Sequence, residues 1–323
     1  MTELPDRPFL KSEIASLGIS PAQLRRLIDD HVVRRVLHGV FARTDLGDDQ
    51  ALRVACARLV LPEHAVVTDR SAAWLHGIDC YDYADLVLGP RLEIVSIDGH
   101  EPLRRPEWLA GKRALTADDI CEIGGVLVTT PLRTACDVAC LRGRRRALGV
   151  IDAFRREFGF DERDFARVLP RFARRRGVIQ LRELVPLSSP LPESQPESWT
   201  RMTIIDEQLP VPKPQVPVFV PGYGYVRLDL AYAELKIAVE YDGEEFHSTD
   251  DDQDADDVRR TALRRAGWIV IVVRKDGFSG PARDAWIMEL RAALNERLPG
   301  RRSKRVYSRG ERRTSYRRSA ARM

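Results

Sequence analysis

The first fifty residues combine a helical pattern with a strand pattern. Apolar residues recur at helical spacing after Ser20-Pro21, a serine cap followed by proline at the first helical position. The next stretch, VVRRVLHGVFART, alternates as two short strands would around His38-Gly39. We therefore expect a helix–turn–helix–wing domain over residues 1–48.

The middle of the chain, residues 49–185, mixes both periods. LEIVSI (92–97) alternates as a strand does, and GGVLVTTP (124–131) reads as a second strand that ends in a helix cap. Helical patterns then continue to about Ala173. An α+β region is expected here.

The last third reads as a mixed sheet flanked by helices. A boundary rich in proline and serine, Pro186 to Pro196, precedes a helix and three successive strand patterns. A further helix, a natural right-handed crossover between parallel strands, then leads to Trp268–Val273, whose continuously apolar sequence predicts a strand buried on both faces. The domain is expected over residues 192–299. The whole chain belongs to the α/β class, α+β overall.

Composition adds a basic tail and excludes a membrane protein. The 323 residues carry a net charge of +4, but residues 300–323 contain ten Lys+Arg against one acid. The body is therefore mildly acidic, and the tail is expected to be disordered, either solubilising or bound to nucleic acid. No apolar run could span a bilayer, and the N-terminus has no secretion signal, so a cytoplasmic location is expected. The arginine runs at 142–147 and 171–177 read as solvated helix faces, with contact to nucleic acid as the alternative.

Three carboxylates are expected to share one face of a β-hairpin within RLDLAYAELKIAVEYDG. Glu240 and Asp242 alternate onto the same face, and a turn after Tyr232 would pair Asp229 near Ala238, diagonal to Glu240. Oxygen ligands this close favour Mg²⁺ or Mn²⁺. The bland alternative is an exposed acidic strand face.

The helix–turn–helix–wing order resembles the start of AbiEi-type antitoxins, and the TDRSAAWLHGI segment that follows occurs at the same point in such proteins. The resemblance implies DNA as a partner, with the helix after Ser20 entering the major groove. Arg25, Arg26, Arg34 and Arg35 would then lie near phosphates. A winged helix that mediates protein contacts instead remains an alternative.

Residues 192–299 resemble the Vsr-like branch of the PD-(D/E)XK endonuclease superfamily. Several features carry this resemblance in order: Glu197 on a helix, Asp229 on a strand, the run EYDG from Glu240, His247, an Asp/Arg-rich helix and Gly267-Trp268.

The resemblance implies metal-assisted hydrolysis of phosphodiester bonds. Asp229 and Glu240 would be the main ligands, helped by Glu197, and His247 would act as an acid or base or hold a phosphate. Asp242 departs from the superfamily, which commonly has a lysine there, and would ligate a second cation or act as a base. The expected function is a metal-dependent DNA endonuclease. The alternative is a non-catalytic DNA-binding regulator of the antitoxin type, and action on RNA and homodimerisation stay open.

Overall fold

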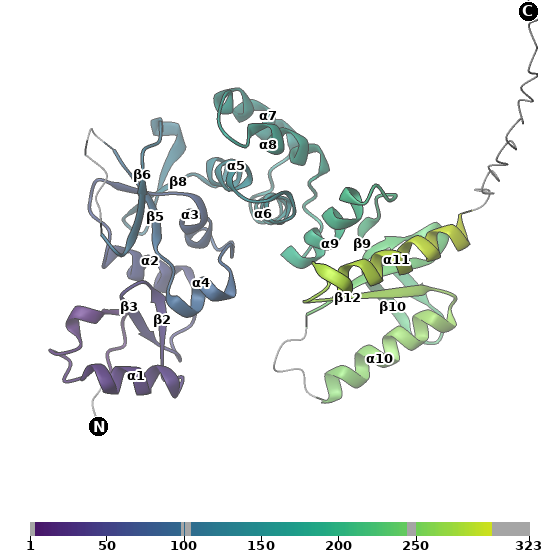
Figure 1. Cartoon of the computed structure of the whole chain (residues 1–323), viewed down its shortest axis with the longest axis horizontal. Helices are drawn as coiled ribbons and strands as arrows, with labels where there is room; N and C mark the ends of the chain where they lie inside the picture. Colours follow the sequence, from purple (N-terminus) through teal and green to yellow (C-terminus); the bar gives the residue numbers. More distant parts are fainter. Residues whose placement is uncertain (1–3, 98–99, 101–104, 244–249, 299–323) are drawn as a thin grey trace, which may run out of the picture.

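Three successive units make up the described part of the chain (Figure 1). The computed structural model describes residues 4–97, 100, 105–243 and 250–298. Helices alternate with three sheets, which confirms the mixed α+β class expected from the sequence. None of the described helices is both long and apolar enough to cross a membrane.

The first unit, the winged-helix region, packs one α-helix on a three-stranded sheet of order β1-β3-β2, and the first helix of the expected helix–turn–helix is only a 3₁₀ turn over Lys11–Glu13. Its helix α1 begins as expected: the Ser20 side chain accepts a hydrogen bond from the Gln23 backbone N–H, and Pro21 follows the cap. A small core surrounds Phe9 and Phe41. The elements are β1 (Phe9–Leu10), η1 (Lys11–Glu13), α1 (Pro21–Asp29), β2 (Val33–Leu37) and β3 (Val40–Arg43).

The wing between β2 and β3 lies against the second unit. At its turn, the backbone N–H of His38 donates to the carbonyl oxygen of Pro90 at 2.9 Å. Gly89 has a φ of 75°, and a Cβ there would stand 2.8 Å from the Leu37 carbonyl oxygen. Only glycine permits both this backbone conformation and this approach, so the wing turn is held by protein contacts.

The second unit starts with a five-stranded sheet of order β6-β5-β4-β8-β7. Its core gathers Val67, Trp74 and Ile94 between the sheet and the helices α2 and α3. The strands expected at 92–97 and 124–131 are present. The elements are α2 (Gln50–Arg58), β4 (Ala65–Val67), α3 (Asp69–Leu75), α4 (Tyr83–Leu88), β5 (Leu92–Ser96), β6 (Trp108–Gly111), η2 (Ala117–Asp119), β7 (Ile120–Ile123) and β8 (Val126–Thr129).

A helical half completes the second unit. Its core, around Phe154, Phe165 and Leu181, is fully buried. The elements are α5 (Pro131–Leu141), α6 (Arg144–Phe158), α7 (Glu162–Val168), η3 (Leu169–Phe172), α8 (Val178–Leu184) and η4 (Val185–Leu187).

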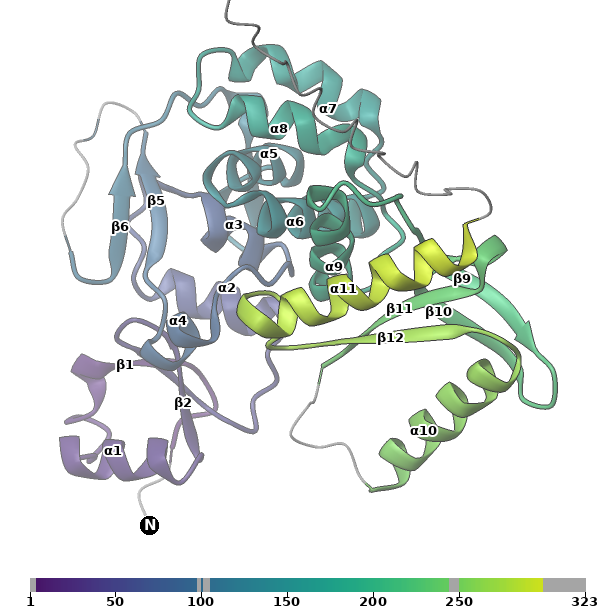
Figure 2. The same cartoon turned by 45° about the vertical axis from the view of Figure 1, so that its right-hand side comes forward.

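The third unit is a four-stranded mixed sheet of order β12-β11-β10-β9 with a helix on each face (Figure 2). As expected, β11 and β12 are parallel and α10 connects them. Helix α11 packs over Val239 and Ile271, and α10 packs over Ala238 and Val270 on the opposite face. The elements are α9 (Gln195–Asp206), β9 (Lys213–Val220), β10 (Gly224–Tyr232), η5 (Ala233–Leu235), β11 (Ile237–Asp242), α10 (Asp250–Arg265), β12 (Ile269–Arg274) and α11 (Gly280–Arg297).

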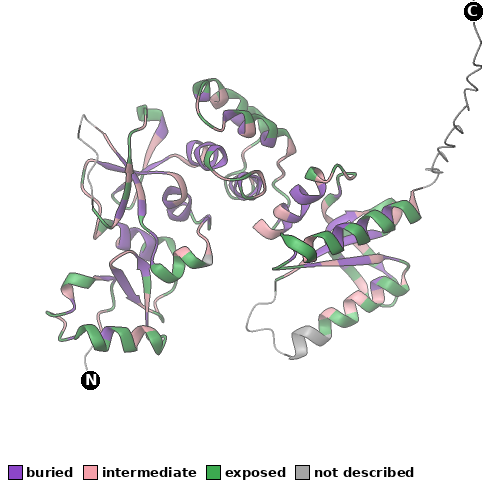
Figure 3. Ribbon diagram, viewed as in Figure 1, coloured by how far each residue is buried: buried purple, intermediate pink, exposed green. Residues whose placement is uncertain are grey.

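Helix α9 belongs to two cores at once. Met202 packs into the core of the helical half, whereas Ile204 packs into the core under α11. Figure 3 shows α9 among the deeply buried helices, between the second and third units. Two contacts fasten its approach: the Ser189 backbone N–H donates to Asp152 at 2.7 Å, and Arg201 donates to the other oxygen of Asp152 at 2.9 Å.

The register of β10 on β11 differs from the expected one. Ala231, and not Asp229, pairs with Ala238. The expectation assumed a two-residue turn, but the chain forms a 3₁₀ turn over Ala233–Leu235, followed by Lys236 with a φ of 49°. This longer connection shifts the pairing by two residues. Continued from the pair Leu230 and Val239, the register places Asp229 opposite Glu240.

Candidate functional site

Two arginines on α1 are free to meet a ligand. Arg25 and Arg26 lie on its exposed face, while Leu24 turns into the winged-helix core. Within the described ranges, neither guanidinium makes a hydrogen bond or ion pair. This arrangement follows from the helical period, which separates adjacent arginines from the apolar stripe.

The other two predicted arginines are partly committed to the fold. Arg34 is half-buried on β2 and donates to the Leu46 carbonyl oxygen at 2.8 Å. Arg35 is exposed and reaches the Val87 carbonyl oxygen on α4 at 3.4 Å. Arg35 is therefore available at the surface, whereas Arg34 also anchors the wing.

A basic cleft of about 740 Å³ opens between the winged helix and α4. Exposed cations line both walls: Lys11, Arg25 and Arg35 from the first unit, and Arg91 from the second. The acid in the lining, Asp85, is already paired with Arg70 at 2.9 Å. The cleft therefore presents an excess of positive charge. Local sequence patterns do not indicate this cleft, because its walls lie about fifty residues apart in the chain.

The hairpin carboxylates meet partly as expected. Asp229 accepts a hydrogen bond from the backbone N–H of Tyr241 at 2.9 Å, which places its carboxylate against β11 beside Glu240. The pairing of β10 with β9 passes over Asp229 and Gln215, where Gln215 has a φ of 53°. At this irregularity the alternation of β10 changes: Leu228 packs on the sheet face under α10, whereas Leu230 packs on the opposite face, under α11.

Glu240 and Asp242 are paired with arginines of α10. Arg259 donates two hydrogen bonds to Glu240, of 2.8 Å to Oε1 and 3.0 Å to Oε2. Arg260 donates to Asp242 at 2.9 Å. Glu240 is 2% exposed, so its charge requires such a partner. Asp256 lies 3.5 Å from Arg259 and 3.6 Å from Arg260.

Glu197 is buried in the first turn of α9, where its backbone N–H donates to the hydroxyl oxygen of the capping residue Ser194. Its carboxylate accepts hydrogen bonds from the Glu193 backbone N–H at 3.0 Å, the Ser194 hydroxyl at 2.8 Å and the Gln215 amide at 2.6 Å. A carboxylate near a helix N-terminus with three donors is well stabilised in place.

The pKa of Asp229 is raised from its usual 3.8 to about 7. Burial is the main cause, and the negative charges of Glu197 and Glu240 act in the same direction. The hydrogen bond from Tyr241 and the charge of Arg259 oppose the rise. Asp229, Glu197 and Glu240 are therefore close enough to influence one another, whereas Asp242, the third acid expected on the hairpin face, pairs with Arg260.

The described carboxylates are not grouped as a site for a divalent cation. In the described ranges, no three His, Cys, Asp or Glu side chains are grouped so that they could hold a metal ion. Both oxygens of Glu240 already accept hydrogen bonds from Arg259. His247 lies outside the described residues. Binding of Mg²⁺ or Mn²⁺ stays a prediction.

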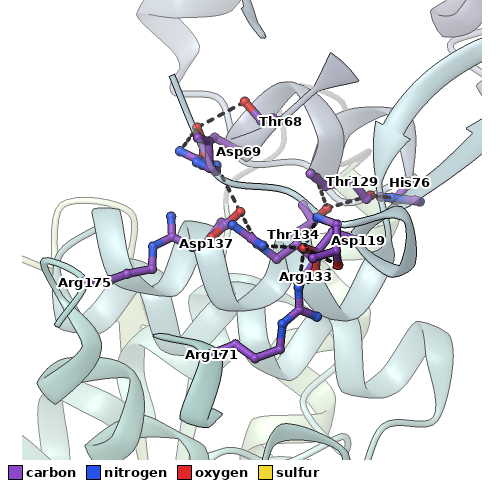
Figure 4. A network of polar contacts seen from close by, with 12 residues as sticks. Thr68, Asp69, His76, Asp119, Thr129, Arg133, Thr134, Asp137, Arg171 and Arg175 are labelled. Carbon is purple, nitrogen blue, oxygen red and sulfur yellow. Dashed lines mark hydrogen bonds and ion pairs between the residues drawn. The ribbon is translucent and has the colours of Figure 1, made fainter. Parts of the chain in front are cut away.

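The second unit contains a buried ionic network that no local sequence pattern indicates (Figure 4). Arg113 forms a two-pronged pair with Asp69, with both bonds at 2.8 Å, and reaches Asp137 at 2.9 Å. Arg133 joins Asp137 to Asp119, at 2.8 and 2.9 Å. The fully buried Asp137 lies on α5 in the helical half. Through Arg113 it is linked to Asp69, the first residue of α3 beside the sheet.

Some arginines of both runs bind other parts of the fold, whereas Arg146, Arg174 and Arg176 are exposed, as expected of solvated faces. Arg175 donates to Asp137 at 2.6 Å, and Arg171 pairs with Asp119. In the other run, Arg145 donates to the Phe278 carbonyl oxygen in the third unit at 2.6 Å. A run of arginines shows charge but not its partners, which lie 38 to 133 residues away.

Comparisons with known proteins support the antitoxin-like part. A sequence model of the AbiEi antitoxin C-terminal domain matches residues 64–187, which cover most of the second unit. Two uncharacterized proteins of Mycobacterium tuberculosis, from strains CDC 1551 / Oshkosh and H37Rv, are each 29% identical over 242 residues. The alignment covers 75% of this chain and 85% of each relative. The second unit of this chain is therefore similar to the C-terminal domain of AbiEi antitoxins.

Proposed function

We propose that the protein is a DNA-binding regulator of the antitoxin type, in which the third unit is a non-catalytic, nuclease-like scaffold. The observation that carries this proposal is the match of residues 64–187 to an antitoxin domain directly after a winged helix. Antitoxins of this class pair such a domain with a DNA-binding one, as the resemblance at the N-terminus implies.

The charges around α1 support DNA as the ligand. Arg25 and Arg26 project from the helix, and Arg25 also lines the basic cleft with Lys11, Arg35 and Arg91. DNA lying on α1 would pass its phosphates along this cleft. The wing turn is held against Pro90, so α1 and the cleft, and not the wing tip, would make the main contacts.

Binding to duplex DNA tests the proposal. The probe is a labelled duplex from the region upstream of the protein's own coding sequence, compared with an unrelated duplex of equal length. Fluorescence anisotropy over a range of salt should give tighter binding to the first. Arg25→Ala and Arg26→Ala should each weaken binding, and a lost phosphate contact should reduce the salt slope by about 1.

Arg182→Ala is the matched control, because Arg182 is exposed on α8, far along the chain from α1. A wild-type protein that binds neither duplex would refute the proposal. So would arginine variants on α1 that bind as the control does.

A metal-dependent endonuclease is the second candidate. It is favoured by Asp229, which is held beside Glu240 and whose pKa is raised mainly by burial and further by the charges of Glu197 and Glu240. The same duplexes, together with supercoiled and single-stranded DNA, are incubated with Mg²⁺ or Mn²⁺ beside Glu240→Ala. Cutting that disappears in the variant would establish the enzyme. Binding without cutting would support the regulator.

A further inference from the structure

The contact between α10 and β11 places positive charge where the sequence led us to expect a metal ion. Arg259 spans both oxygens of Glu240, and Arg260 takes Asp242. Together the two guanidinium groups carry the charge of one divalent cation. The Glu240 side chain is 3% exposed and that of its partner Arg259 is 24% exposed, so the charge of Glu240 itself is shielded from water.

We propose that Arg259 and Arg260 take the place of a divalent cation at the β11 carboxylates, and that Asp229 and Glu240 become a cation site once Arg259 is withdrawn. Hard cations bind carboxylate oxygens at about 2.0–2.6 Å, through the same lone pairs that the Arg259 fork now uses. A cation and the fork therefore exclude each other at Glu240.

The surroundings favour a cation when the fork is absent. Without Arg259, the buried charge of Glu240 loses its two-pronged partner, keeps only the longer contact of 3.9 Å to Arg260, and stands near Asp229 and Glu197. Buried like charges are costly, and a cation that binds between them removes that cost. Asp229 is already held toward β11 by the Tyr241 N–H, so little rearrangement of β10 is needed.

The proposal concerns cation binding alone and does not depend on DNA binding. It implies that the wild-type protein folds without metal and that its carboxylates stabilise the α10 contact. It also implies that affinity for a divalent cation is a latent property of this hairpin, set by one side chain on the neighbouring helix.

Titration of the full-length chain with Mn²⁺ tests the proposal, with the spectroscopic signal of free Mn²⁺ and the melting temperature as readouts. Wild-type protein should leave millimolar Mn²⁺ free and show no change in melting temperature. Arg259→Ala should bind one Mn²⁺ per chain and melt higher in its presence. Adding Glu240→Gln to Arg259→Ala should abolish both effects.

Arg264→Ala is the matched control, an exposed arginine on the same helix that should behave as the wild type does. Arg259→Met is the second variant, because it keeps an apolar side chain of similar length that can preserve the packing if alanine does not, and it leaves the Glu240 oxygens without a donor at this position. Stoichiometric Mn²⁺ binding by the wild type that Glu240→Gln removes would overturn the proposal. Folded Arg259 variants that gain no Mn²⁺ affinity would also overturn it.

Discussion

Asp229 illustrates how a buried position changes the acid–base behaviour of one residue. Burial and the charges of Glu197 and Glu240 raise its pKa to about 7. The folded protein therefore holds the Asp229 proton more tightly than the unfolded chain does. Protonation of Asp229 therefore adds to the free energy of unfolding. This contribution is fully present below pH 4 and is lost as the pH rises through about 7.

Asp229→Asn should accordingly stabilise the protein in alkaline solution. Asparagine keeps an oxygen that can accept the Tyr241 N–H but carries no charge. The unfolding free energy of the variant relative to wild type should rise by about 2–4 kcal/mol between pH 5 and pH 8. Urea unfolding at both pH values measures it, with Asp276→Asn as the control for loss of a surface charge. An equal difference at the two pH values would contradict the prediction.

At the scale of elements, buried ion pairs fix how helices meet. Asp152 on α6 is fully buried and takes Arg201 from α9, just as Asp137 takes three arginines in the second unit. Such pairs offset a large desolvation cost only while both partners remain. They therefore specify one packing of α9 on α6 and penalise others.

Arg201→Ala should destabilise the protein by about 3–5 kcal/mol, because it leaves Asp152 buried without a cation. The double variant Arg201→Met with Asp152→Leu removes both charges and should recover most of this loss. Chemical unfolding of the wild type, Arg201→Met, Asp152→Leu and the double variant gives the coupling energy directly. If the single and double variants lose the same stability, the ion pair does not orient α9.

On the scale of the whole molecule, the second and third units are joined through α9 and through side chains that cross between them. Met202 and Ile204 serve different cores, and Arg145 lies 5.1 Å from the ring centre of Phe278. The proline- and serine-rich segment before α9 therefore does not separate two independent cores, because the core of the second unit includes Met202 of α9.

Truncation should reveal this dependence. A fragment of residues 1–208 keeps α9 and should unfold cooperatively, whereas residues 1–190 lose Met202 and leave Asp152 unpaired. The shorter fragment should melt at a clearly lower temperature and expose its amides in α6 to rapid hydrogen exchange. Circular dichroism and hydrogen exchange compare the two. Equal stability of the fragments would show that α9 belongs to the third unit alone.

The sequence by itself determined most elements and one local site. Periodicity and caps located α1, the wing strands, the parallel crossover through α10 and the strand β12, since these depend on neighbours within a few residues. The same local signals brought Asp229 and Glu240 onto adjoining strands. Exposed Arg25 and Arg26 also followed from helical spacing.

Tertiary structure decided the register and the partners of the charges. The hairpin shifted by two residues because the 3₁₀ turn at Ala233–Leu235 lengthened the connection. Arg259 reaches Glu240 across 19 residues, and Arg113 reaches Asp69 across 44. A charge in the sequence can meet any opposite charge that folding brings near. Only packing in three dimensions selects which one, because desolvation makes an unpaired buried charge too costly to keep.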